Sequence, residues 1–141
     1  MKYVVLVSHG QFAEGLANAL SMLAGSRDDV LAVGLEDGKT ADEFAGVFEE
    51  RIASITVDDD IILLGDLIGG SPLTTAMNVI TNKGLMNHTT VIGGMNLPLA
   101  LTTVLMKDAL DKEAFVAQVI SEGTTALREL QIEVEEDEDD I

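Results

Sequence analysis

One of the two histidines in this 141-residue chain stands behind a continuous apolar run, in the sequence "VVLVSHG". Residues 3–7 have the pattern of a buried strand, and His9 follows them closely. A second apolar run, residues 61–64, is followed in the same way by Asp66. A carboxylate that holds one imidazole nitrogen leaves the other nitrogen free to act as a nucleophile. The two residues therefore predict a nucleophilic histidine, provided that the fold brings the two strand ends together.

A glycine-rich turn after Asp66 predicts a place for an anion. The sequence "GDLIGGSP" reaches Gly70 and Ser71 and then Pro72. Serine as N-cap, with proline in the first turn, indicates the start of a helix. The first backbone amides of a helix have no partner within it, and they bind anions readily. A nucleophilic nitrogen beside such a helix start suggests a phosphohistidine on His9, with the phosphate held at Gly70 and Ser71.

Strands and helices alternate along the rest of the chain. Apolar runs predict strands at residues 3–7, 30–35, 61–64 and 89–92. Helical spacing predicts helices over residues 11–24, over residues 71–84 and around residues 101–105. A capping box at Thr40 and Glu43 predicts the start of another helix. The last predicted helix begins at Asp111 and has its apolar positions at Phe115, Val119, Ala126 and Leu130. The end of the chain, "QIEVE", alternates apolar and charged residues and predicts a short fifth strand.

This alternation predicts a doubly wound α/β fold. Four parallel strands in the order 2-1-3-4 would carry helices on both faces of the sheet. Ligands of such folds bind at the carboxyl ends of the strands where the winding direction reverses, here between strands one and three. His9 and Asp66 end these two strands, so we expect them to lie side by side. His88, which precedes strand four, is expected at the opposite edge, and Asn96 is a candidate cap for the next helix.

Composition limits the classes of function. The chain has no cysteine, which excludes disulfides, thiolate metal sites and a cysteine nucleophile. Its formal net charge of −17 disfavours nucleic acid and anionic membranes as partners. Seven of the 25 acidic residues lie in the last nine positions, so we expect one domain over residues 1–135 and an acidic tail at 136–141. With no signal peptide and no apolar span, we expect a cytoplasmic protein without membrane insertion.

The set "VSHG", "GDLIGGSP" and "GGMNLP", in this order on a βα framework, resembles the enzyme IIA components of the mannose class (mannose, fructose and sorbose type) of the bacterial phosphoenolpyruvate-dependent sugar phosphotransferase system (PTS). The resemblance implies that His9 accepts a phosphoryl group from the phosphocarrier protein HPr and passes it to the cognate enzyme IIB. It also implies that Asp66 orients His9, that Gly70 and Ser71 receive the phosphate, and that no metal or other cofactor takes part.

Further partners follow from the same resemblance. Enzyme IIB is expected on a separate polypeptide, with the sugar carried by the membrane components IIC and IID. Family members form homodimers, and "QIEVE" is a candidate for a C-terminal antiparallel strand exchanged between subunits. A flat apolar rim would suit the docking of successive partners, and its candidate residues are Phe12, Leu67, Ile68, Met95 and Leu97.

Other functions on the same fold remain open. One is the phosphotransfer subunit of a dihydroxyacetone kinase system, and another is a non-catalytic binding module. A histidine phosphatase of the mutase type would need arginine before the histidine, where this chain has Ser8. A serine hydrolase would need a Gly-x-Ser-x-Gly turn, and "GGSPL" lacks its last glycine. The test that separates the open alternatives is whether His9 takes phosphate, and from which donor.

Overall fold

Four strands form one parallel sheet in the order β2-β1-β3-β4. They are β1 (Lys2–His9), β2 (Val30–Leu35), β3 (Asp60–Gly65) and β4 (Thr89–Gly93). The computed structural model describes residues 1–134 of the chain. The predicted strand order is confirmed, and β1 and β3 are central neighbours whose carboxyl ends meet at one edge of the sheet.

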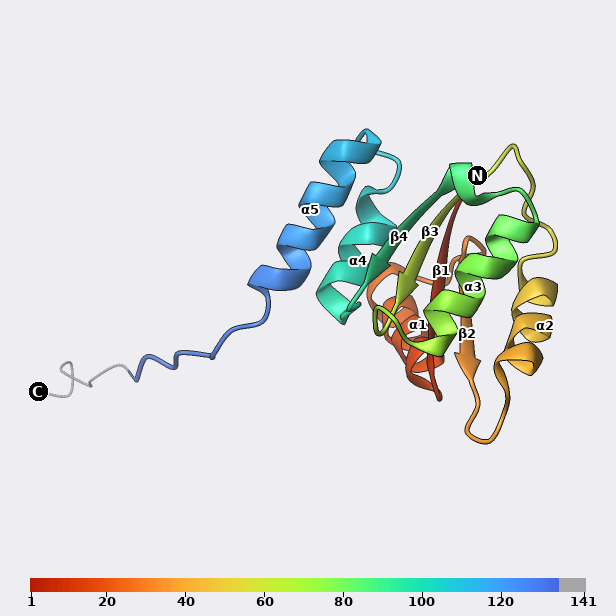
Figure 1. Cartoon of the computed structure of the whole chain (residues 1–141). Helices are drawn as coiled ribbons and strands as arrows, with labels where there is room; N and C mark the ends of the chain where they lie inside the picture. The colour runs from red at the N-terminus through yellow and green to blue at the C-terminus, as the bar shows by residue number, and fades with distance from the viewer. Residues whose placement is uncertain (135–141) are drawn as a thin grey trace, which may run out of the picture.

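Helices cover both faces of this sheet (Figure 1). On one face lie α1 (Phe12–Ala24) and α4 (Leu97–Met106), and α5 (Lys112–Thr125) packs beside α4. The other face carries α2 (Ala41–Arg51) and α3 (Ser71–Asn82), and the short helix η1 (Met86–His88) leads into β4. Within residues 1–134, no helix has the length and apolar character needed to cross a membrane. The two-sided cover explains the continuous apolar runs of β1 and β3, because these central strands are buried on both faces.

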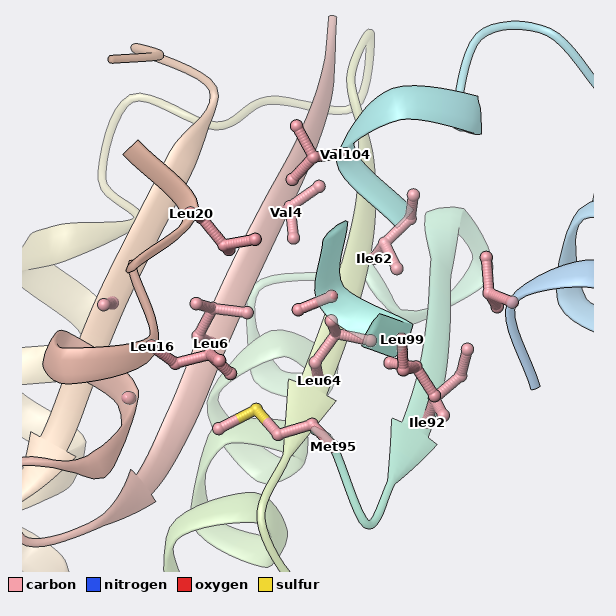
Figure 2. Packing of buried hydrophobic residues seen from close by; sticks show 14 of the residues in the cluster. Val4, Leu6, Leu16, Leu20, Ile62, Leu64, Ile92, Met95, Leu99 and Val104 are labelled. Atoms are coloured by element: carbon pink, nitrogen blue, oxygen red, sulfur yellow. The ribbon is translucent and has the colours of Figure 1, made fainter. Parts of the chain in front are cut away.

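The alternation of side chains along β1 divides the core into two clusters. Val4 and Leu6 point toward α1 and α4, whereas Val5 and Val7 point toward α2 and α3, and all four are 0% exposed. Figure 2 shows the first cluster, in which Val4 and Leu6 meet Leu16 of α1 and side chains of α4. Because successive residues of a strand face opposite sides, the two residues that end β1 must also diverge.

Local signals place the helix starts, with one correction. The capping box of α2 is confirmed, since the Thr40 hydroxyl accepts from the Glu43 N–H and the Glu43 carboxylate accepts from the Thr40 N–H. Asn96 caps α4 through the Leu99 N–H, as expected. The prediction of Ser71 as N-cap is wrong: Gly70 takes that place in an extended conformation, and Ser71 is the first helical residue.

The C-terminal predictions are also corrected. Helix α5 ends at Thr125, so Ala126 and Leu130 lie outside it. Residues 131–134 form no strand, and the rest of "QIEVE" and the acidic tail at 136–141 lie outside the described residues. Figure 1 shows the segment after α5 running away from the sheet. Leu127 and Leu130 are 87% and 80% exposed, so their packing against residues 1–134 is too slight to support further turns of helix.

At the edge opposite the carboxyl ends of the strands, a buried lysine pairs with two aspartates. Lys107 is 3% exposed, and its Nζ lies 2.9 Å from Asp29 Oδ2 and 3.1 Å from Asp108 Oδ2. Arg27 donates two further hydrogen bonds to Asp29. Hydrogen bonds from Arg27 and, to a smaller extent, from Lys107 lower the pKa of Asp29 to about 2 against the opposing effect of burial. Asp29 therefore stays ionised and balances the buried ammonium group.

Replacing Asp29 with asparagine should destabilise the fold in a pH-dependent way. Because the folded-state pKa of Asp29 lies below its ordinary value of 3.8, its contribution is complete above that value and is lost as the pH falls toward 2. We expect Asp29→Asn to lower the free energy of unfolding by about 2 kcal/mol at neutral pH and by less in acid. Urea unfolding at several pH values measures both effects.

The control is Asp108→Asn. The Asp108 side chain is 70% exposed, so this substitution should lower the free energy of unfolding by under about 1 kcal/mol. Equal losses in the two variants would show that the buried pair is no stronger than an exposed one.

Candidate functional site

His9 and Asp66 meet at the carboxyl ends of β1 and β3. The His9 Nδ1 atom lies 2.8 Å from Asp66 Oδ2, and the same oxygen accepts the His9 backbone N–H at 2.9 Å. The other carboxylate oxygen, Oδ1, accepts the Leu67 backbone N–H at 2.9 Å. The sequence prediction that these two side chains lie together is confirmed. Asp66 holds the histidine through its ring and through its main chain.

The environment of Asp66 determines which nitrogen of His9 is free. Burial is the largest influence on Asp66 and acts to raise its pKa, but the hydrogen bonds from His9 and Leu67 together outweigh it, and the pKa is lowered. An ionised carboxylate only accepts hydrogen bonds, so in a neutral ring the proton lies on Nδ1. The Nε2 atom then carries the lone pair. The His9 side chain is 49% exposed, whereas that of Asp66 is 13% exposed, so the ring is accessible and its partner is sheltered.

The start of α3 lies against the His9 ring. A Cβ atom at Gly70 would lie 3.0 Å from His9 Cε1 and 3.8 Å from Nε2. The φ angle of Gly70 is −81°, which any residue adopts. Glycine is therefore needed here for close approach to the ring and not for its backbone conformation.

The first amides of α3 are available to an anion. The N-cap residue Gly70 has no side chain to bond them, and the first turn carries no acidic residue. The starts of three other helices are capped by side chains, those of Thr40, Asn96 and Asp111. Ser71, in the first turn of α3, is exposed. The start of α3 thus has no side-chain cap and lies beside Nε2 of His9, an arrangement that suits an anion.

The five residues predicted for an apolar rim differ in exposure. Phe12, Leu67 and Ile68 are 49%, 58% and 82% exposed, respectively. Met95 is 4% exposed, and Figure 2 shows it inside the core near Leu64, so its assignment to the rim is wrong. The Met95 backbone N–H donates to the Gly65 carbonyl at 3.0 Å, and this bond holds the segment after β4 against the end of β3. Leu97 is half-buried, and it packs against the same cluster.

Gly34, which was not among the predicted site residues, packs against the turn after His9. Gly34 of β2 lies so close to the Gly10 carbonyl oxygen that a Cβ atom at position 34 would overlap it. The Gly10 backbone N–H donates to the Leu35 carbonyl at 2.7 Å, and Gly10 has a φ angle of +55°. A glycine inside a strand pattern is a signal for such an approach, and "VLAVGL" contains it.

The second histidine lies elsewhere, as expected. His88 precedes β4 at the opposite edge of the sheet, and its Nδ1 atom is 3.7 Å from Asp60 Oδ1. Asp60 begins β3, whereas Asp66 follows its end. Each histidine thus has an acidic partner, but only His9 lies beside the uncapped start of α3.

Together, the fold and the site define a doubly wound α/β protein with an accessible, carboxylate-held histidine at its switch point. The family model described as "PTS system fructose IIA component" (EIIA-man) matches residues 3–120. The chain belongs to this family, the mannose-class enzyme IIA components of the PTS.

Individual relatives agree with the family match. The chain is 27% identical over 134 residues to the PTS system mannose-specific EIIAB component of Escherichia coli (strain K12), which covers 92% of this chain and 41% of that protein. The chain thus spans about two fifths of the length of this relative. Among solved structures, phosphotransferase system component EIIA from Streptococcus agalactiae matches with 21% identity and a TM-score of 0.78, covering 92% of this chain and 97% of that one. The PTS IIA protein associated with the fucose utilization operon from Streptococcus pneumoniae has 25% identity and a TM-score of 0.77, covering 91% and 92%.

The contact between Gly70 and the His9 ring leads to a specific prediction. Gly70→Ala should leave the free energy of unfolding within about 1 kcal/mol of wild type, because the φ angle suits alanine. The added methyl group should displace the ring and change the NMR signal of its Cε1–H. The control is Gly15→Ala in α1, where a Cβ atom meets nothing within 4 Å. The contact would be disproved if the His9 signal moved no further in Gly70→Ala than in Gly15→Ala.

Proposed function

We propose that this chain carries a phosphoryl group on the Nε2 atom of His9, accepting it from HPr and passing it to enzyme IIB of a sugar PTS. The observation that carries the proposal is the hydrogen bond between His9 Nδ1 and Asp66, which leaves Nε2 free beside the start of α3. Membership of the IIA family supports a role in phosphotransfer. In this scheme the chain works in the cytoplasm, ahead of the membrane components IIC and IID.

The transfer step follows from the protonation of the ring. The Nε2 lone pair attacks the phosphorus atom of the donor's phosphohistidine, and the donor's N–P bond breaks with its electron pair returning to the donor's imidazole. The His9 ring gains positive charge as its own N–P bond forms, and its Nδ1 proton stays hydrogen-bonded to Asp66. The ionised carboxylate stabilises that charge. When the group leaves for enzyme IIB, the same events run in reverse, and neutral imidazole is the leaving group.

Phosphoryl transfer of this kind depends on position and on electrostatic stabilisation of the oxygens. We propose that the phosphoryl oxygens lie at the start of α3, where the backbone amides of Ser71 and Leu73 and the Ser71 hydroxyl donate to them. Pro72 has no N–H, so it contributes no donor. Gly70 provides the space in which the phosphate approaches the helix axis, and the positive end of the helix dipole favours the anion.

The exposed apolar residues beside the site suit two partners that dock in turn. Phe12 begins α1, and Leu67 and Ile68 belong to the loop between Asp66 and Gly70. Phe12 lies on the helix that follows His9, and Leu67 and Ile68 directly follow Asp66. We propose that HPr and enzyme IIB both contact them, because each partner must bring its own histidine to the same Nε2 atom.

We further propose that two copies of the chain pair through their C-terminal segments. Strand β4 ends the sheet, and a groove of about 410 Å³ lies between it and α5, lined by Val91, Val116 and Ile120 among others. The exposed residues Ile132 and Val134 alternate with charged ones, as in a strand with one apolar face. A second copy's segment would pair with the free edge of β4 and place these side chains in the groove.

Sedimentation equilibrium tests this pairing. We expect the full chain to sediment as a dimer and Ile132→Asp/Val134→Asp as a monomer. The control variant is Val57→Asp, which changes a valine that is 60% exposed and distant from the groove in sequence, and it should remain dimeric. A monomeric wild-type chain would refute the proposal.

The relay itself is tested by intact mass after incubation with phosphoenolpyruvate, enzyme I and HPr. Wild type should gain one acid-labile phosphoryl group, and His9→Ala should gain none. His88→Ala is the matched control, because it removes the other histidine, and it should be phosphorylated like wild type. Phosphate retained in His9→Ala, or absent from wild type while a known IIA protein is phosphorylated alongside, would rule out the relay through His9. Phosphorylation only by components of a dihydroxyacetone kinase system would favour that alternative.

A further inference from the structure

The side chain of Ser8 is enclosed between the end of β1 and the start of α1. It is 0% exposed. Its hydroxyl accepts the Ala13 backbone N–H at 2.7 Å and donates to the His9 carbonyl at 3.0 Å. The alternation of β1 requires this direction, because Ser8 shares its face with Val4 and Leu6, toward α1. His9 therefore faces the opposite side, toward α3.

These hydrogen bonds complete the restraint on the backbone of His9. Asp66 accepts the His9 N–H at 2.9 Å, and the Ser8 hydroxyl donates to the His9 carbonyl. The same hydroxyl bonds the first turn of α1, where the N-cap residue Gln11 makes no side-chain hydrogen bond. The peptide unit after His9 is thus tied to both β1 and α1. Most rotations of the His9 backbone would break at least one of these hydrogen bonds.

We propose that Ser8 is a positioning residue for phosphoryl transfer at His9, an inference that rests on the proposed function. The direction of a side chain from Cα is determined by the backbone on either side of it. A tilt of the His9 peptide would move Nε2, at the far end of the ring, away from the start of α3 and weaken the bond from Nδ1 to Asp66. Transfer between two histidines requires the attacking nitrogen in line with the bond that breaks, so small displacements are costly.

The test compares Ser8→Ala with a variant that loses an equivalent buried hydroxyl elsewhere. Thr103 is also 0% exposed, and its hydroxyl donates to the Leu99 carbonyl at 2.8 Å within α4. Thr103→Val is therefore the matched control. We expect the single-turnover transfer rate from phosphorylated HPr to fall about tenfold or more in Ser8→Ala. In Thr103→Val it should stay within about twofold of wild type. Ser8→Thr, which keeps the hydroxyl, should recover most of the rate.

The ¹⁵N signals of the His9 ring provide a second readout that general destabilisation would not move. Wild type should show one tautomer with the proton on Nδ1, and Ser8→Ala should show a mixture of tautomers. A wild-type rate and unchanged ring signals in Ser8→Ala would overturn the proposal, as would an equal loss of rate in Thr103→Val. If HPr does not phosphorylate wild type at all, the proposed function fails, and the ring signals of unphosphorylated Ser8→Ala still decide whether Ser8 positions His9.

Discussion

The hydrogen bond from His9 Nδ1 to Asp66 is the interaction on which the chemistry of this site depends. It needs an ionised carboxylate, and the three hydrogen bonds that Asp66 accepts keep it ionised although it is mostly sheltered from solvent. With Nδ1 committed as a donor, the ring has one nucleophilic atom, and that atom lies beside Gly70. One short contact thus determines the tautomer of the neutral ring, and in the proposed transfer it also leaves Nε2 as the attacking atom.

The parallel sheet supplies this contact because β1 and β3 are neighbours whose carboxyl ends lie at one edge. The chain leaves β1 for the face covered by α1 and leaves β3 for the face covered by α3. The two connections diverge, and the space between them is where the histidine meets the start of α3. At the opposite edge, the ion pair of Lys107 with Asp29 joins the loop that precedes β2 to the segment that follows α4. At the edge that holds His9 and Asp66, residues 1–134 contain one other ion pair, the exposed contact of Lys39 with Glu43 at the start of α2.

Much of this arrangement could be predicted from the sequence, since it follows from periodicity. Apolar runs and helical spacing predict the strands and helices, their alternation indicates a doubly wound fold, and the strand order of such a fold places His9 beside Asp66. The errors arise where tertiary packing decides the outcome. The direction of Met95 depends on a backbone bond to Gly65, and the end of α5 depends on the burial of Leu127 and Leu130, which follow it and are exposed. The role of Ser8 could not be predicted, because a serine before a histidine carries no signal until the two faces of β1 are known.

In the proposed function, Asp66 directs phosphorylation to a single nitrogen of His9. The most direct test is a ¹⁵N and ³¹P NMR spectrum of the phosphorylated protein with labelled histidine, in which the coupling identifies the nitrogen bonded to phosphorus. We expect the phosphoryl group on Nε2, with the proton still on Nδ1. A phosphoryl group on Nδ1 would mean that the bond to Asp66 breaks before transfer, and it would contradict the claim that Asp66 leaves Nε2 as the nucleophile.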